Sequence, residues 1–168
     1  MTIRRSVISV IILDSLSLAD TGSYDCKQFP TEDVPMRETR HPESEAPAIR
    51  AYETFIAALN SGDNQAMFEV MHVPHIRISG NGVVIYETKE ELESEYLNGF
   101  ASRAGETWHH TEMDWVQALH SSENKVHLYL QWTRYDKDGK AIATHPALWI
   151  MTRVGGKWGA QCRSSFAP

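Results

Sequence analysis

The hydrophobic pattern of the chain changes its period at Gly105, and this change limits the fold more than any other feature of the sequence. Before Gly105, apolar residues recur at steps of three and four, which is typical of amphipathic helices. After it, apolar and polar residues alternate, which predicts long strands at about 107–119, 125–136, 141–153 and 157–165. Long antiparallel strands twist and bend, so helices can pack on the concave face. We therefore predict an α+β fold, with three N-terminal helices packed on a curved antiparallel sheet.

Local signals place the helices. Ser44 and Pro47 indicate the start of the first helix and Gly62 its end, and Asp63 is a candidate N-cap residue for a second, shorter helix. The other expected boundaries are the end of the second helix at 72–74, short strands at 75–79 and 83–86, and a capping-box start of the third helix at 88–91.

The N-terminal part of the chain differs from the rest. Residues 1–44 lack periodicity and are expected to be a poorly structured extension, followed by one domain at 45–168. Arg4 and Arg5 precede an apolar run, which is the outline of a secretory signal, but the run at 7–13 is far shorter than the roughly 20 residues that span a bilayer. We expect a cytoplasmic protein, with secretion through residues 1–19 as the alternative.

Charge and cysteine content exclude several classes of partner and site. The net charge of −6 argues against nucleic acid and anionic membranes, which need a basic protein face. Cys26 and Cys162 form no Cys-x-x-Cys motif, so neither a redox motif nor a structural zinc site is indicated.

Two motifs carry a resemblance to a known family. The end of the first helix reads FIAALNSGD at 55–63, and the turn before the last strand reads VGGKW at 154–158. With these motifs the chain resembles, over roughly residues 47–166, the nuclear-transport-factor-2-like superfamily and its SnoaL-like and steroid-isomerase-like branch. The resemblance implies a cone with a small-molecule pocket between the helices and the concave sheet. It also implies a dimer through the outer sheet face. Members of this family include isomerases, cyclases, dehydratases and proteins without known catalysis.

The steroid-isomerase residues themselves do not occur here. Their pocket tyrosine corresponds to Phe55, their general base to Ser79, and their second oxyanion acid to Leu148. A serine cannot abstract a C–H proton unaided, so catalysis by that mechanism is not expected.

His110 is instead the predicted catalytic residue, oriented by Asp114 or Glu112. In a strand these three side chains share one face, and the placement of Leu148 turns that face inward. A carboxylate beside an imidazole raises its pKa and fixes its tautomer. The alternatives are a solvated His110 at the open end of the sheet, with His75 or His109 facing the pocket. The same groups with His75 or His145 resemble a metal site, but we predict no metal and no cofactor.

The predicted ligand-binding residues are Tyr52, Phe55, His75, Trp132 and Arg134. Arg134 is either a rim charge or an anchor for a carboxylate. The expected function is cofactor-independent acid–base catalysis on a small apolar or mixed-polarity molecule, as in an isomerase, cyclase or dehydratase. The alternative is a non-catalytic ligand-binding or dimeric association domain.

A homodimer is expected from the opposite face of the sheet. Aromatic and polar side chains that belong on an outer face suggest that a second copy covers it. They are Tyr129, Gln131, Thr133 and Tyr135, with His145, Trp149 and Met151 on the next strand.

Overall fold

The computed structural model of the chain describes residues 40–167. The predicted extension and the signal-like run therefore lie outside the described residues, apart from the last few positions before 45. Within residues 40–167, no helix is both long enough and apolar enough to cross a membrane.

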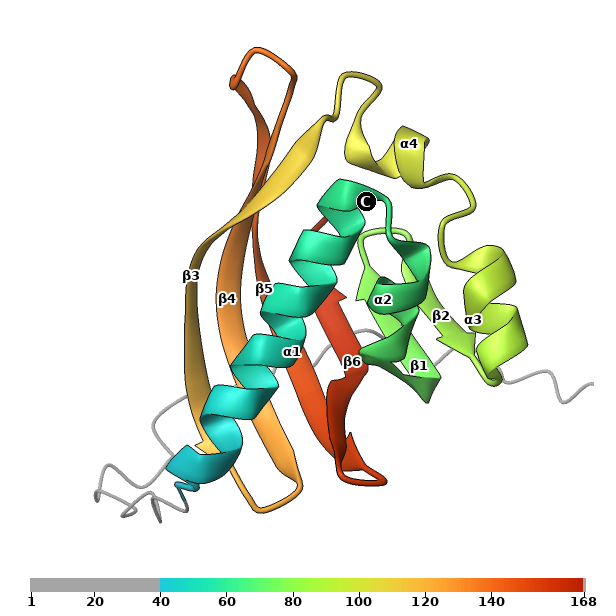
Figure 1. Ribbon diagram of the computed structural model, residues 1–168. Coiled ribbons are helices and arrows are strands. Elements are labelled where there is room, and N and C mark those ends of the chain that lie inside the picture. The colour runs from blue at the N-terminus through green and yellow to red at the C-terminus, as the bar shows by residue number, and fades with distance from the viewer. Residues whose placement is uncertain (1–39, 168) are drawn as a thin grey trace, which may run out of the picture. The chain divides into compact units, whose positions relative to one another are not determined.

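Among the described residues, four helices and two strands come first along the chain, and four strands that complete a curved sheet follow the change of period (Figure 1). The elements are α1 (Pro42–Ser61), α2 (Asn64–Glu69), β1 (Met71–Ser79), β2 (Gly82–Tyr86), α3 (Lys89–Glu95), α4 (Phe100–Ala104), β3 (His110–Ser121), β4 (Lys125–Tyr135), β5 (Ala141–Val154) and β6 (Lys157–Ser165). The described strands form one sheet in the order β2-β1-β6-β5-β4-β3. Its neighbouring strands run antiparallel except β1 and β6, which are parallel. The predicted α+β class is confirmed.

Three helix boundaries differ from the prediction. Helix α1 begins at Pro42, so that Ser44 lies buried in its first turn and donates to the carbonyl of Glu123 instead of capping the helix. Helix α2 ends at Glu69, and residues 72–74, predicted to end that helix, already belong to β1. The third helix is divided into α3 and α4 at Gly99, whose φ of 67° is left-handed.

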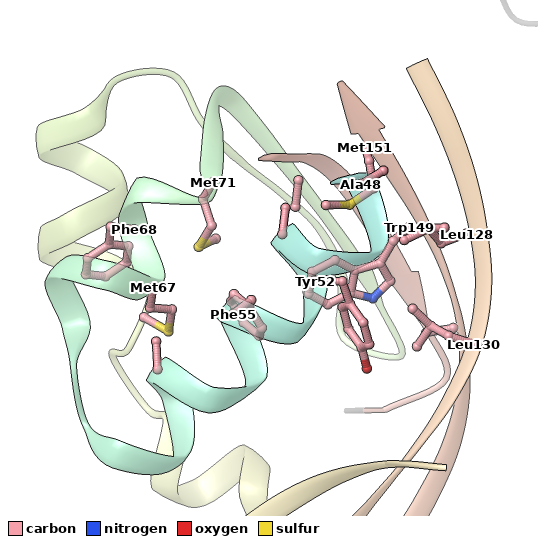
Figure 2. Packing of buried hydrophobic residues seen from close by; sticks show 14 of the residues in the cluster. Ala48, Tyr52, Phe55, Met67, Phe68, Met71, Leu128, Leu130, Trp149 and Met151 are labelled. Carbon is pink, nitrogen blue, oxygen red and sulfur yellow. The ribbon is translucent and has the colours of Figure 1, made fainter. Parts of the chain in front are cut away.

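The core lies between α1 and the concave face of the sheet (Figure 2). Tyr52 and Phe55 of α1 pack edge-on against Trp149 of β5, with ring centroids 4.8 Å and 5.0 Å away. Leu128 and Leu130 of β4 are fully buried beside them. The apolar stripe predicted for the first helix therefore faces the sheet.

The predicted outer face of β5 is wrong. Trp149 and Met151 are 3% and 0% exposed and belong to the core, and His145 packs on Trp132 of the inner face. The segment at 147–151 is apolar on both faces, so alternation alone cannot tell which face points inward. Pairing decides it, because Trp149 lies directly opposite the buried Leu128.

The predicted face of β3 is also wrong. The pairing of β3 with β4 shifts between Met113 and Trp115, which is the signature of a β-bulge. Thr111 is buried and Met113 packs against the core, whereas Glu112 and Asp114 are exposed. An uninterrupted alternation over this strand, as assumed from the sequence, therefore assigns the wrong residues to the concave face.

Candidate functional site

A cavity lies between α1, α4 and the concave face of the sheet. The space inside it is about 650 Å³ when the open solvent at its mouth is included, and the centre of a water-sized sphere can occupy about 60 Å³ of it. Its apolar and aromatic walls are formed by Phe55, Ile56, Leu59, Ile78, Tyr96, Phe100, Trp132, Trp149 and Ala167.

Four arginines line the same cavity, and each comes from a different element. Arg77 belongs to β1, Arg103 to α4, Arg134 to β4 and Arg163 to β6. The remaining lining residues are Thr111 and Ser165, so no carboxylate of residues 40–167 lines the cavity. The site combines aromatic walls with four arginine side chains.

Arg77 and Arg163 lie side by side in the sheet. They are direct partners in the parallel pairing of β1 with β6, and Trp149 lies opposite Arg163 on the other side. Like charges placed opposite each other destabilise a sheet. Burial, followed by repulsion from Arg163 and Arg103, lowers the pKa of Arg77 below its ordinary value.

Aromatic rings surround the guanidinium of Arg163. Its central carbon lies 4.5 Å from the ring centroid of Tyr96, 5.8 Å from that of Trp149 and 5.9 Å from that of Phe55. These are cation–π distances. The Nε atom is buried without a hydrogen-bond partner among the described residues, as is the hydroxyl of Tyr96. The ring contacts hold this charge in place but leave hydrogen-bonding capacity unused.

The other two arginines are tied to the backbone around α4. Arg134 donates to the carbonyl of Arg103 and lies 4.7 Å from the ring centroid of Trp132. Arg103 in turn donates to the carbonyls of Tyr96 and Asn98. Burial, and then repulsion from Arg163, Arg103 and Arg77, lowers the pKa of Arg134 to about 10.

The predicted ligand-binding residues separate into two groups. Phe55, Trp132 and Arg134 line the cavity, whereas Tyr52 and His75 do not. Tyr52 is fully buried in the core behind Trp149, and burial raises the pKa of its hydroxyl well above the ordinary value. Its hydroxyl has no hydrogen-bond partner among the described residues.

His75 is a fully buried histidine of β1. Its Nδ1 lies 3.0 Å from the carbonyl oxygen of Ala160, so Nδ1 carries the proton and donates. Its Nε2 is buried without a partner among the described residues, close to the rings of Tyr86 and Tyr96. Burial, followed by repulsion from Arg163, lowers the pKa of His75 to about 3. The imidazole is therefore neutral at physiological pH.

The predicted catalytic pair lies away from the cavity. His110 stacks on Tyr135, with ring centroids 5.2 Å apart, and its Nε2 is 3.5 Å from Glu112 Oε1. Asp114 accepts hydrogen bonds from Gln131 and Thr133 on the outer face of β4. Neither residue lines the cavity, and His110 and Asp114 do not contact each other in these bonds.

Thr111 takes the inward position instead, because hydrogen bonds from α1 determine which residues of β3 point toward the helix. The Asn60 side chain donates to the Thr111 carbonyl and accepts from the Thr111 amide, both at 2.8 Å.

A metal site was the alternative considered for the histidines and carboxylates. Residues 40–167 contain no cluster of His, Cys, Asp and Glu side chains with the geometry of a metal site.

Sequence reasoning missed Arg77, Arg103 and Arg163. Each resembles an ordinary surface charge when its neighbours in sequence are considered alone. The convergence of Arg77 with Arg163 depends on the parallel pairing of β1 with β6, which joins segments more than eighty residues apart.

Comparison with solved structures identifies the fold. A cystatin-like protein of unknown function from Nostoc punctiforme superimposes with a TM-score of 0.62 at 11% identity, over 76% of this chain and 93% of that one. A ketosteroid isomerase-like protein from Erwinia carotovora gives 0.53 at 21% identity, over 76% and 100%. The protein Aln2 from Streptomyces gives 0.58 at 14%, over 76% and 93%. No family model and no curated protein matches the sequence.

Proposed function

We propose that this chain, which has the nuclear-transport-factor-2-like, cystatin-like fold, binds a small organic molecule of mixed polarity between its helices and its concave sheet. The supporting observation is the cavity itself, in which aromatic walls adjoin a few convergent polar groups. Binding sites for small molecules combine these two features, because the walls supply apolar contact and the polar groups fix orientation.

Binding is better supported than acid–base turnover. General acid–base catalysis near neutral pH needs a side chain such as His, Asp or Glu within reach of the substrate. The lining residues of the described chain include none of these. The roles assigned from the sequence to His110 and Asp114 stay predictions, and the positions of both side chains give them no support.

Catalysis by a hydrogen-bond donor is the second candidate, on a different pair of residues. Tyr96 lines the cavity, and both its hydroxyl and the Nε2 of the neighbouring His75 are buried without partners among the described residues. Burial raises the pKa of Tyr96, so the phenol stays protonated at neutral pH and can donate a hydrogen bond but cannot act as a base. A reaction that needs only a hydrogen-bond donor to a substrate oxygen fits this arrangement.

Filling the cavity should abolish binding. Leu59→Trp adds bulk to a lining residue of α1, and we expect at least about tenfold weaker binding of any compound that binds the wild-type protein, because overpacking displaces the ligand. Small aromatic acids, amides and alcohols would be screened by the fluorescence of Trp132 and Trp149. Leu119→Trp is the control, since Leu119 is exposed and does not line the cavity. Equal binding to Leu59→Trp and wild type contradicts the proposal.

We also propose a homodimer through the outer sheet face, with its residues corrected. Trp115, Tyr129 and Leu148 of neighbouring strands are all more than a third exposed there, and the Trp115 and Tyr129 rings are in contact. A twofold pair would bury this apolar face isologously. We expect Leu148→Glu to halve the mass measured by light scattering at micromolar concentration. Val154→Glu, at the exposed β5–β6 turn, is the control. A wild-type protein that is already monomeric contradicts the dimer.

A further inference from the structure

We infer that the ligand of this cavity is an organic carboxylate with a flat aromatic or conjugated body, and that Arg163, beside Arg77, holds its carboxylate. This inference rests on the proposed binding function and adds the chemical class of the ligand. It starts from the charge of the lining, which has arginines on four elements and no carboxylate among the described residues.

The first step is electrostatic. A charge withdrawn from water is costly unless a counter-charge or hydrogen bonds compensate it, and Arg163 is partly buried, with its Nε atom fully buried. None of the ion pairs among residues 40–167 involves Arg163, and its close contacts are aromatic rings. Arg163 also stands directly beside Arg77, whose pKa its charge helps to lower. A bound anion offsets the cost at Arg163, whereas a neutral ligand of the same shape does not.

The second step concerns the unused donors. The Nε of Arg163 and the hydroxyl of Tyr96 are buried without partners, and the guanidinium lies 4.5 Å from the Tyr96 ring. A carboxylate accepts from both kinds of donor, and the planar fork of a guanidinium matches its two oxygens. By contrast, Arg134 and Arg103 already donate to backbone carbonyls at α4. Arg163 is therefore the anchor, whereas Arg134 and Arg103 are already held by backbone carbonyls.

The third step is the shape of the ligand's body. Trp132, Trp149 and Phe55 line the cavity from two neighbouring strands and from α1. Aromatic walls of this kind favour a flat ring, which can stack or pack edge-on against them. The same rings that hold Arg163 would then also contact the ligand.

The experiment compares a charged probe with its neutral isostere. Calorimetric titrations of the full-length wild-type protein would use cinnamate and cinnamamide, with phenyl phosphate as a second oxyanion. We expect cinnamate to bind at least about tenfold more tightly than cinnamamide, the ratio that one charge-assisted contact supplies. Arg163→Met should remove this preference and leave cinnamamide unchanged. Arg153→Met, at an exposed arginine outside the cavity, should behave as wild type.

Each outcome decides between the two proposals. Equal binding of cinnamate and cinnamamide to wild type overturns the carboxylate inference and leaves the binding function standing. Preference for phenyl phosphate over cinnamate also overturns it, in favour of a phosphate ester. Both proposals fail if no probe binds wild type in the titrations and no probe changes its melting temperature more than that of Leu59→Trp. The wild-type titrations decide the question even if Arg163→Met does not fold.

Discussion

Replacing Trp149 with Ala should lower the free energy of unfolding by about 3–5 kcal/mol, the usual cost of truncating a large aromatic side chain in a core. Trp149 is 3% exposed and contacts Tyr52 and Phe55 of α1, so its loss leaves a cavity where the helix meets the sheet (Figure 2). Urea denaturation followed by far-ultraviolet circular dichroism measures this change.

The matched control is the preceding residue in the chain. Leu148→Ala removes an apolar side chain that is 39% exposed on the outer face, and we expect a change within about 1 kcal/mol in the monomer. The two substitutions together test which face of β5 points inward. If Leu148→Ala costs more than Trp149→Ala, the alternation of this strand is opposite to the one described.

The order of the elements and the number of strands could be predicted because they depend on local pattern. Gly62 ends α1 in a left-handed conformation, and Asp63 caps α2 by accepting from the Ala66 amide. The inward faces of β3 and β5 could not be predicted in the same way. In β5 both faces are apolar, and in β3 a bulge after Met113 interrupts the alternation. Both faces are settled by contacts with other elements, such as the Asn60 bonds to Thr111.

The candidate site shows the same division. Phe55, Trp132 and Arg134 were found because each extends an apolar face predicted from its own segment. Arg77 and Arg163 were missed because they become part of one site only through the pairing of β1 with β6, which neither segment indicates by itself. His110 was selected for its neighbours in sequence, Glu112 and Asp114, whose side chains lie on the exposed side of β3. Titratable residues that are close in sequence thus indicated the lining of the cavity less well than residues that strand pairing brings together.

Acid should destabilise the protein through His75. Burial lowers the pKa of His75 from 6.5 to about 3, so the unfolded chain takes up a proton at mildly acidic pH while the native protein does not. The contribution of His75 to stability is complete above its unfolded pKa of 6.5 and is lost progressively as the pH falls toward 3. The loss is about 1.4 kcal/mol per pH unit in this window, or on the order of 3 kcal/mol between about pH 7 and about pH 4.5.

His75→Gln isolates this effect. Glutamine does not titrate, yet its amide can still donate to the Ala160 carbonyl that His75 Nδ1 contacts. The free energy of unfolding of the variant, measured by urea denaturation across this pH range, should fall less steeply than that of wild type. Carboxylates such as Glu43 and Glu45, whose pKa values are lowered by hydrogen bonds and by His41 and Arg40, affect both proteins alike and cancel in the difference. His120→Gln, which removes an imidazole at an exposed position, is the matched control. Parallel slopes for wild type and His75→Gln would mean that His75 takes up its proton without unfolding, and that its Nε2 is in reach of water or of a partner supplied by the cavity.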